Sequence, residues 1–126
     1  MKILGIDYGE KRIGLAISDE TLTLARELDI RSPKEFWNKL PQTISENEIT
    51  KIVIGWPLNM SGGATKKTRE VGSFKLKVET KTGLPVNTID ERLSSQMAEH
   101  LKGNKKDLDS LAAQILLQNY LDKHKN

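Results

Sequence analysis

The stretch ILGIDYGEKRIGLAISD, residues 3–19, decides the fold of this 126-residue chain. Its apolar runs at 3–7 and 12–18 predict two strands, and the intervening YGEK supplies Gly9, which we expect to adopt the positive φ of a tight hairpin turn. Asp7 follows the first apolar run directly, and burying a carboxylate is costly unless something pairs with it. The partner of Asp7 is therefore the first question that the sequence raises.

The residues after this hairpin predict a third strand and a helix. Over residues 22–30 apolar side chains alternate with polar ones, as in a half-buried antiparallel strand, and these are Leu22, Leu24, Leu28 and Ile30. Ser32, Pro33 and Glu35 form a capping box that begins a helix. The apolar face of that helix comprises Phe36, Trp37, Leu40 and Ile44. Pro41 should break or kink it midway.

Strands and helices alternate in the remainder of the chain. KIVIGWP, residues 51–57, is almost wholly apolar and predicts a central strand. A Gly/Ser loop then leads into a helix that ends near Thr82 with Gly83 as its stop, and we expect LPVNTID, residues 84–90, to form a fifth strand. The inward side chains of the helix should be Val71, Phe74 and Val78.

The last third of the chain predicts two more helices. Ser94 or Ser95 caps a short one that ends at Gly103, and a final helix runs from about Leu108. Its apolar face should comprise Leu108, Leu111, Ala112, Ile115 and Leu116. These elements predict a single α/β domain over residues 1–126, with a mixed five-stranded sheet flanked by helices.

The charge of the chain is modest in sum but uneven along it. There are 20 Lys+Arg against 17 Asp+Glu, while residues 31–81 alone carry ten basic and five acidic side chains. The densest part is KKTREVGSFKLK, residues 66–77. Such a segment suits a polyanionic partner, and it is equally typical of a solvated helix face.

Several classes of protein are excluded or disfavoured by what the sequence lacks. Without cysteine there is no disulfide framework, thiolate metal site or cysteine nucleophile. No apolar run approaches the ~18 residues of a membrane span, and Asp7 interrupts any signal-peptide core, so we expect a cytoplasmic protein with no membrane partner. His100 and His124 lie away from the acidic residues, which disfavours a zinc site.

Acidic residues follow strands at two places and recur near the start of the last helix. Asp7 ends the first strand, Asp90 and Glu91 end the fifth, and Asp109 begins the last helix. If these strand ends meet, the clustered carboxylates repel one another unless a cation joins them, and hard oxygen ligands suit Mg²⁺ or Mn²⁺. Two such ions would stabilise both the attacking and the leaving oxygen of a phosphodiester displacement.

Each acid also has a structural explanation that the residues alone leave open. Asp109, with Asp107, could complement the dipole of the last helix, and Asp7 could accept hydrogen bonds from the turn that follows it. At the end of the fifth strand a surface ion pair is the alternative, with Asp90 or Glu91 bound to Arg92 or Lys102. The nearby cations Lys11, Arg12 and Arg92 could grip a phosphate or merely neutralise the acids.

Four blocks of this sequence resemble the YqgF/RuvX family in order and spacing. They are GIDYGEKRIGLAISD, VIGWPLNMSGG, DERLSS and DLDSLAAQILLQNYL, and they cover nearly the whole chain. The resemblance implies a ribonuclease H-like fold of the RuvC type, with sheet order 3-2-1-4-5. It also implies an endonuclease, described for the family as the enzyme that matures the 5′ end of precursor 16S ribosomal RNA or as a Holliday junction resolvase.

Carried over by position, the resemblance implies that Asp7, Glu91 and Asp109 are the catalytic, metal-binding carboxylates, so that it favours Glu91 over Asp90. The chain departs from the family where Glu10 replaces an Asp and where Ser94-Ser95 replaces Thr-Thr. A fourth acid of RuvC-type sites has only an uncertain stand-in here, Asp107. We expect the substrate phosphates to contact six cations, Lys11, Arg12, Arg92, Lys66, Lys67 and Arg69.

Two other classes of function remain as alternatives. An actin-like ATPase also begins with a DxG hairpin, but its nucleotide lies between two lobes, each of this size or larger. A nucleic-acid-binding module without catalysis is the second, and retention of all three acids disfavours it. The expected partner is precursor ribosomal RNA or branched DNA, a monomer or a homodimer is possible, and the loop from Asn59 to Ala64 is expected to close over it.

Overall fold

Five strands form one mixed sheet in the order β3-β2-β1-β4-β5, as the resemblance implied. The computed structural model describes residues 1–59, 61–90 and 105–124, without the side chains of 105–110. The strands are β1 (Lys2–Asp7), β2 (Ile13–Ser18), β3 (Ala25–Arg31), β4 (Ile49–Trp56) and β5 (Val86–Asp90). β1 pairs antiparallel with β2 and parallel with β4, and β4 pairs parallel with β5, so the carboxyl ends of β1, β4 and β5 meet at one edge.

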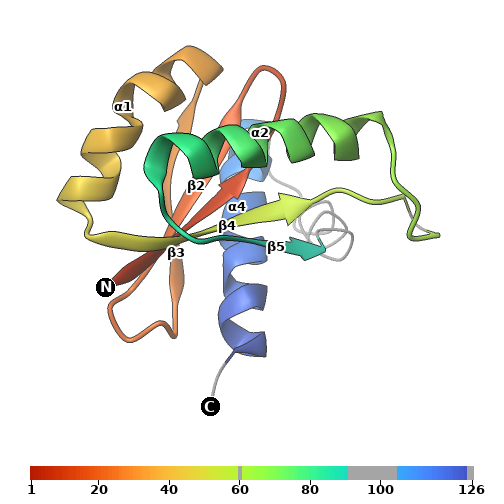
Figure 1. Cartoon of the computed structure of the whole chain (residues 1–126). Helices are drawn as coiled ribbons and strands as arrows, with labels where there is room; N and C mark the ends of the chain where they lie inside the picture. The colour runs from red at the N-terminus through yellow and green to blue at the C-terminus, as the bar shows by residue number, and fades with distance from the viewer. Residues whose placement is uncertain (60, 91–104, 125–126) are drawn as a thin grey trace.

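Helices cover both faces of this sheet (Figure 1). The helices are α1 (Pro33–Glu46), α2 (Lys66–Thr82) and α4 (Lys105–Lys123). Side chains of α1 and α2 share one buried cluster with alternate residues of the strands, and side chains of α4 share a second cluster on the opposite face. We call these the α1/α2 face and the α4 face. The strand predicted to be central, β4, is interior, between β1 and β5, although the middle strand of the five is β1.

The helix α1 begins as predicted and does not break at Pro41. Ser32 and Glu35 form both hydrogen bonds of the capping box, with Pro33 in the first turn. The helix continues through Pro41 to Glu46, so the expected break is wrong. A proline removes only one backbone hydrogen bond of a helix, and core contacts on both sides of Pro41, by Leu40 before it and Ile44 after it, hold the two halves in one helix.

The strand predicted over 22–30 is shorter and shifted in its register. It begins at Ala25, while Leu24 is 66% exposed and Leu22 adopts a φ of 58° in the preceding turn. The carboxylate of Asp19 accepts hydrogen bonds from the backbone N–H groups of Thr23 and Leu24, which ties residues 19–24 into a loop. That side-chain contact competes with strand pairing, and the apolar alternation does not reveal it.

Gly9 is required for a different reason from the one expected. It is not among the described residues with positive φ, so the left-handed turn is wrong. A Cβ on Gly9 would instead overlap the carbonyl oxygen of Arg12. The β1–β2 turn therefore depends on a close backbone approach. By contrast, Gly83 ends α2 at a φ of 68°, which confirms the predicted stop.

The last helix begins earlier than predicted, and its predicted buried face is confirmed only in part. It starts at Lys105 rather than near Leu108. Ile115 and Leu116 are buried as predicted, whereas Leu111 and Ala112 are half-exposed and the side chain of Leu108 lies outside the described residues. The other buried residues of the helix are Ala113, Leu117, Tyr120 and Leu121. The short helix predicted from Ser94 or Ser95 to Gly103 lies outside the described residues. No helix in the described part of the chain is long and apolar enough to cross a membrane.

Candidate active site

Asp7 ends β1 at the carboxyl edge of the sheet and belongs to the α4 face. Ile3 packs in the cluster on that face, and a Cβ on Gly5 would stand 2.8 Å from the Cβ of Leu117 in α4. Because successive strand residues point to opposite faces, Asp7 points to the same face as Ile3 and Gly5. Its side chain is half-buried. The sequence placed Asp7 correctly at a strand end, and the structure adds the face.

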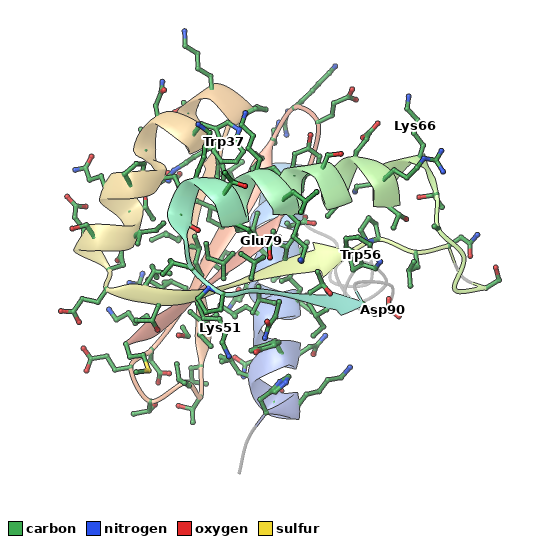
Figure 2. All side chains as sticks on the ribbon, viewed as in Figure 1. Trp37, Lys51, Trp56, Lys66, Glu79 and Asp90 are labelled. Atoms are coloured by element: carbon green, nitrogen blue, oxygen red, sulfur yellow. The ribbon has the colours of Figure 1, made fainter. Side chains whose placement is uncertain are left out.

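Asp90 belongs to the opposite face. It pairs with Trp56 in the register of β4 and β5, and both lie at the ends of their strands (Figure 2). Its neighbour Ile89 packs in the cluster of the α4 face, and Asn87 donates a hydrogen bond to Tyr120 of α4 at 2.8 Å. Strand alternation therefore directs Asp90 to the α1/α2 face, away from Asp7. The residues alone left open whether Asp90 or Glu91 joins Asp7 in the site. Asp90 does not lie on the same face of the sheet as Asp7.

The backbone of α4 carries Asp109 toward the carboxyl edge. Leu117 lies over Gly5, and Tyr120, further along the helix, contacts Asn87 and Lys51 near the starts of β5 and β4. Earlier helix residues therefore extend toward the strand ends. At a rise of ~1.5 Å per residue, Asp109 precedes Leu117 by about 12 Å along the helix axis. Asp109 lies beyond the first turn of α4, where the influence of the helix dipole has largely fallen off.

One described residue, Asp7, suits a divalent cation in its chemistry. Asp7 supplies hard carboxylate oxygens on the face that α4 covers, at the edge toward which the start of α4 extends. Glu91 and Arg92 lie outside the described residues, and so do the side chains of Asp107 and Asp109. Among the residues that the structure does describe, no three His, Cys, Asp or Glu side chains come together as a metal site. The structure therefore brings together one predicted acid, Asp7, and the helix that bears another.

Two of the predicted phosphate contacts lie in the turn directly after Asp7. Lys11 and Arg12 are both exposed there, between β1 and β2. The overlap that forbids a side chain on Gly9 fixes the path of this turn relative to Arg12. Both cations are therefore held near the carboxyl end of β1 and are accessible to a ligand.

Three further predicted contacts, Lys66, Lys67 and Arg69, are exposed in the first turns of α2. Because α2 follows the parallel strand β4 and returns toward the start of β5, its first turn lies on the side of the carboxyl edge, where Figure 2 places Lys66. Lys66 lies 4.0 Å from Glu70 in an exposed pair. No acidic residue occupies the first turn, where the helix dipole would favour one. The exposed cations and the positive end of the helix dipole at the start of α2 together suit an anionic ligand.

Thr68 positions these cations, and the sequence analysis missed it. Its hydroxyl donates to the carbonyl oxygen of Pro57 directly after β4, and Thr65 and Thr68 form a reciprocal capping box. The side chain is buried at 4% exposure. The spacing Thr65-x-x-Thr68 resembles a capping box with Thr in place of Glu or Gln, and that substitution concealed the signal.

The loop before α2 is closed on itself. Asn59 accepts hydrogen bonds from the backbone N–H groups of Ser61 and Gly63, and Leu58 pairs with Ala64 in an isolated bridge. Gly62 has a φ of 91°, which favours glycine at this position. Closure of this loop over a substrate stays a prediction.

Comparison with known proteins relates this arrangement to nucleases. A family model described as "RuvX: Holliday junction resolvase" matches residues 1–123. A protein of Dictyoglomus turgidum named "Putative pre-16S rRNA nuclease" is 38% identical, with 97% of this chain and 94% of the relative covered. A protein of the same name from Maridesulfovibrio salexigens is 39% identical, with 96% and 98% covered.

Among solved structures, Thermus thermophilus RuvC in complex with a Holliday junction substrate is similar along nearly its whole length. The TM-score is 0.60, with 98% of this chain and 94% of that chain covered. The sequence identity is 15%, so this likeness concerns the fold alone.

Proposed function

This chain belongs to the RuvX family, and on that premise we propose that it is a Mg²⁺- or Mn²⁺-dependent endonuclease. Its substrate is structured nucleic acid, and the names of the relatives favour precursor 16S ribosomal RNA at its 5′ end. The fold is ribonuclease H-like, as the sequence resemblance implied. An enzyme with this substrate acts in the cytoplasm.

One observation carries the proposal. Asp7 lies at the carboxyl end of β1 on the face that α4 covers, and the start of α4, which bears Asp109, extends toward the same edge. Parallel strands flanked by helices bind ligands at the carboxyl edge of the sheet. A carboxylate at that place suits a site for a metal and a phosphate better than it suits the core.

The proposed ligands of the metal are Asp7, Glu91 and Asp109. Asp90 is a poor candidate because it points to the opposite face from Asp7, and this supports its neighbour Glu91. A bound divalent cation would supply Lewis-acid stabilisation of the charge that develops on the phosphate during hydrolysis.

The cations of the chain would bind and orient the substrate. Lys11 and Arg12 extend from the turn beside Asp7 and can donate to phosphate oxygens close to the scissile bond. The first turns of α2, with Lys66, Lys67 and Arg69, can hold a more distant stretch of the backbone. Phosphate contacts of this kind set the position of the substrate and carry no base specificity. We include Arg92 among them from the resemblance alone.

A cleavage assay tests the proposal. A transcript that carries the 5′ precursor segment of 16S rRNA is incubated with the protein and Mg²⁺ or Mn²⁺, and a parallel sample contains EDTA. We expect cleavage at the 5′ boundary that EDTA abolishes and that added metal restores. Cleavage that persists in EDTA at the same rate would refute the metal-dependent mechanism.

The description of the family model favours a second candidate, a Holliday junction resolvase. Symmetric resolution of a four-way junction needs two active sites, and therefore a dimer, whereas trimming an RNA end does not. A synthetic four-way DNA junction in the same assay, with the molecular mass in solution measured alongside, separates the two. Paired symmetric nicks by a dimer would favour the resolvase, and cleavage of RNA by a monomer would favour the ribosomal role.

A further inference from the structure

Two hollows on the α1/α2 face meet at Trp37. One lies between α1 and the end of α2 and is lined by Trp37, Leu40, Pro41, Ile44, Lys81 and Thr82. The other reaches toward the end of β1 and is lined by Tyr8, Trp37, Glu70, Ser73, Phe74 and Lys77. Each has a volume of about 370 Å³. We call the two hollows together the α1–α2 groove, and Figure 2 shows Trp37 between the ribbons of the two helices.

The aromatic side chains that line this groove pack against buried phenylalanines of the core. Tyr8 lies 4.5 Å from Phe74 between ring centroids, and Trp37 lies 4.9 Å from Phe36 and 5.5 Å from Phe74. Phe36 and Phe74 are buried, whereas Tyr8 and Trp37 are only half-buried. Two partly exposed rings are therefore fixed by two buried ones, so a flat ligand would meet a surface that needs little ordering.

Among the described residues, the lysines that line the groove lack the ion pairs that other lysines of α1 and α2 form. Lys75 lies 3.3 Å from Glu79, and Lys39 lies 3.5 Å from Glu35. Lys77 and Lys81 line the groove, one in each hollow, and neither forms an ion pair within the part of the chain that the structure describes. The Nζ of Lys77 lies 4.5 Å from the centroid of the Trp37 ring. Two exposed charges one helical turn apart thus flank an aromatic ring.

We infer that the α1–α2 groove binds a single-stranded segment of the nucleic acid substrate, with a base stacked on Trp37 and the backbone phosphates on Lys77 and Lys81. The inference rests on the proposed nuclease function for the identity of the ligand. Aromatic rings beside unpaired cations are the usual means of binding single strands, because bases stack on the rings and phosphates pair with the charges. Lys77, on its flexible stem, can leave the Trp37 ring for a phosphate.

The position of the groove connects it to the cleavage site. Tyr8 directly follows Asp7, and the two side chains point to opposite faces at the end of the same strand. A strand of nucleic acid that leaves the groove past Tyr8 therefore arrives at the carboxyl edge. A paired base cannot stack on a protein ring without leaving its duplex, so the groove selects the unpaired part of a structured substrate.

Fluorescence tests this inference without any cleavage. The chain contains two tryptophans, so Trp56→Phe leaves Trp37 as the only one, and it is excited selectively at the red edge of its absorption band, where the two tyrosines do not absorb. This variant is titrated with a ten-residue oligouridylate in EDTA. We expect saturable quenching of the Trp37 emission, because a stacked base quenches the indole. Unchanged emission while the oligonucleotide is bound, as judged by the anisotropy of a dye-labelled copy in a parallel titration, would overturn the inference.

Substitutions then measure what the groove contributes to affinity. Trp37→Leu should weaken oligouridylate binding at least about fivefold. The double variant Lys77→Gln, Lys81→Gln should weaken it by a similar factor. Trp37→Phe, which keeps a ring, should recover part of the loss. Lys123→Gln, at the far end of α4, removes one charge away from the groove and should leave the affinity unchanged. Thermal melts establish that each variant is folded, and equal affinity of the folded Trp37→Leu protein would contradict the proposal.

The same variants separate this inference from the proposed function. If no substrate is cleaved but the Trp37 emission is quenched, the groove stands and the nuclease assignment fails. If a blunt hairpin and a hairpin with a single-stranded end are cleaved at unchanged relative rates by Trp37→Leu, the nuclease stands and the groove fails. Emission that changes with protein concentration alone would show that a second copy of the chain occupies the groove, which also overturns the inference.

Discussion

Gly5 of β1 and Leu117 of α4 approach each other so closely that a Cβ on Gly5 would stand 2.8 Å from the Cβ of Leu117. Leu117 is fully buried, and α4 is the only described helix on this face of the sheet. The contact therefore sets how near α4 comes to the strand that ends in Asp7. The glycine fixes the distance between two elements that each carry a proposed metal ligand.

Gly5→Ala should therefore damage both stability and cleavage. The added methyl group meets a backbone-proximal atom of Leu117, which cannot rotate away, so α4 must shift, and overpacking of this kind costs about 1–3 kcal/mol. A misplacement of ~1 Å at the proposed site can lower turnover about 100-fold. Urea unfolding and the cleavage rate of the folded fraction check the two effects.

Gly72→Ala is the matched control. This glycine lies inside α2, and its Cβ would stand 3.5 Å from the Trp56 ring, which is an ordinary contact. Alanine is favoured over glycine in a helix interior by about 0.5–1 kcal/mol, so the variant should be slightly more stable and equally active. Equal effects of the two glycine substitutions would show that the approach of α4 does not govern the site.

Asp7→Asn and Asp90→Asn should differ sharply in their effect on cleavage. Both acids end parallel strands of the same edge, but they point to opposite faces of the sheet. Loss of the Asp7 carboxylate should lower the metal-dependent cleavage rate at least about 1,000-fold with the fold intact, since one of few charged ligands is removed. Asp90→Asn should retain a rate within about threefold. Circular dichroism of both proteins establishes the fold. A folded but inactive Asp90→Asn protein would show that the site includes the α1/α2 face and would contradict the proposed ligands.

Local signals account for the part of the fold that the sequence predicted correctly. The capping box of Ser32 and Glu35 and the helix stop at Gly83 involve residues only a few positions apart, so their physics is visible in the sequence. The start of β3 is different, because it depends on a carboxylate, Asp19, that binds backbone groups four and five residues later. The requirement for Gly9 likewise comes from a backbone contact with Arg12 that no residue pattern encodes.

In the candidate site, too, local features were predictable from the sequence and features that depend on distant contacts were not. The end of a buried apolar run predicted the position of Asp7, and that position is confirmed. The sequence left open whether Asp90 or Glu91 is the acid that joins Asp7, and only the register of β5 against β4 and its contacts with α4 show that Asp90 is directed away from Asp7. The aromatic contacts of Trp37 with Phe74 join helices separated by a whole strand and loop, so they were invisible in the sequence.

Removing the cations of α2 should weaken binding of RNA in a salt-dependent manner. With Lys66, Lys67 and Arg69 all changed to Gln, the slope of log Kobs against log salt should become shallower by about 0.7–0.9 for each phosphate that the protein no longer neutralises. The measurement uses the Asp7→Asn protein and the precursor transcript, by anisotropy between 50 and 200 mM KCl. Stability should change little, because the three side chains are exposed.

A triple variant of equal charge serves as the control for this experiment. Lys2, Arg26 and Lys123, each changed to Gln, remove three positive charges from the opposite, amino end of the sheet. This protein should keep the slope of the parent. An equally shallow slope in both variants would mean that net charge, rather than the start of α2, binds the RNA.

Asp29→Asn should reveal a stabilising contact that disappears in acid. The buried Arg31 donates from Nε to Asp29 at 2.9 Å and from its terminal nitrogen to Thr43 at 2.8 Å. Burial raises the pKa of Asp29, but hydrogen bonds from Arg31 and from the Ile30 backbone lower it by more, so the folded pKa lies below the usual value. A carboxyl whose pKa is depressed on folding stabilises the protein above its unfolded pKa of about 3.9, and this contribution is lost as the pH falls through the folded pKa.

Because the Asp29 side chain is 43% exposed, the substitution should cost only about 1 kcal/mol of unfolding free energy at pH 7. The difference between the parent and Asp29→Asn, measured by urea unfolding from pH 7 to pH 2, should shrink below about pH 4. Asp19 and Glu35 also have lowered pKa values, owing first to hydrogen bonds from Thr21 and from the Ser32 backbone respectively, but both acids are present in the two proteins and cancel in the difference. A difference that stays constant over the whole range would mean that the Asp29 carboxylate does not stabilise Arg31 through its charge.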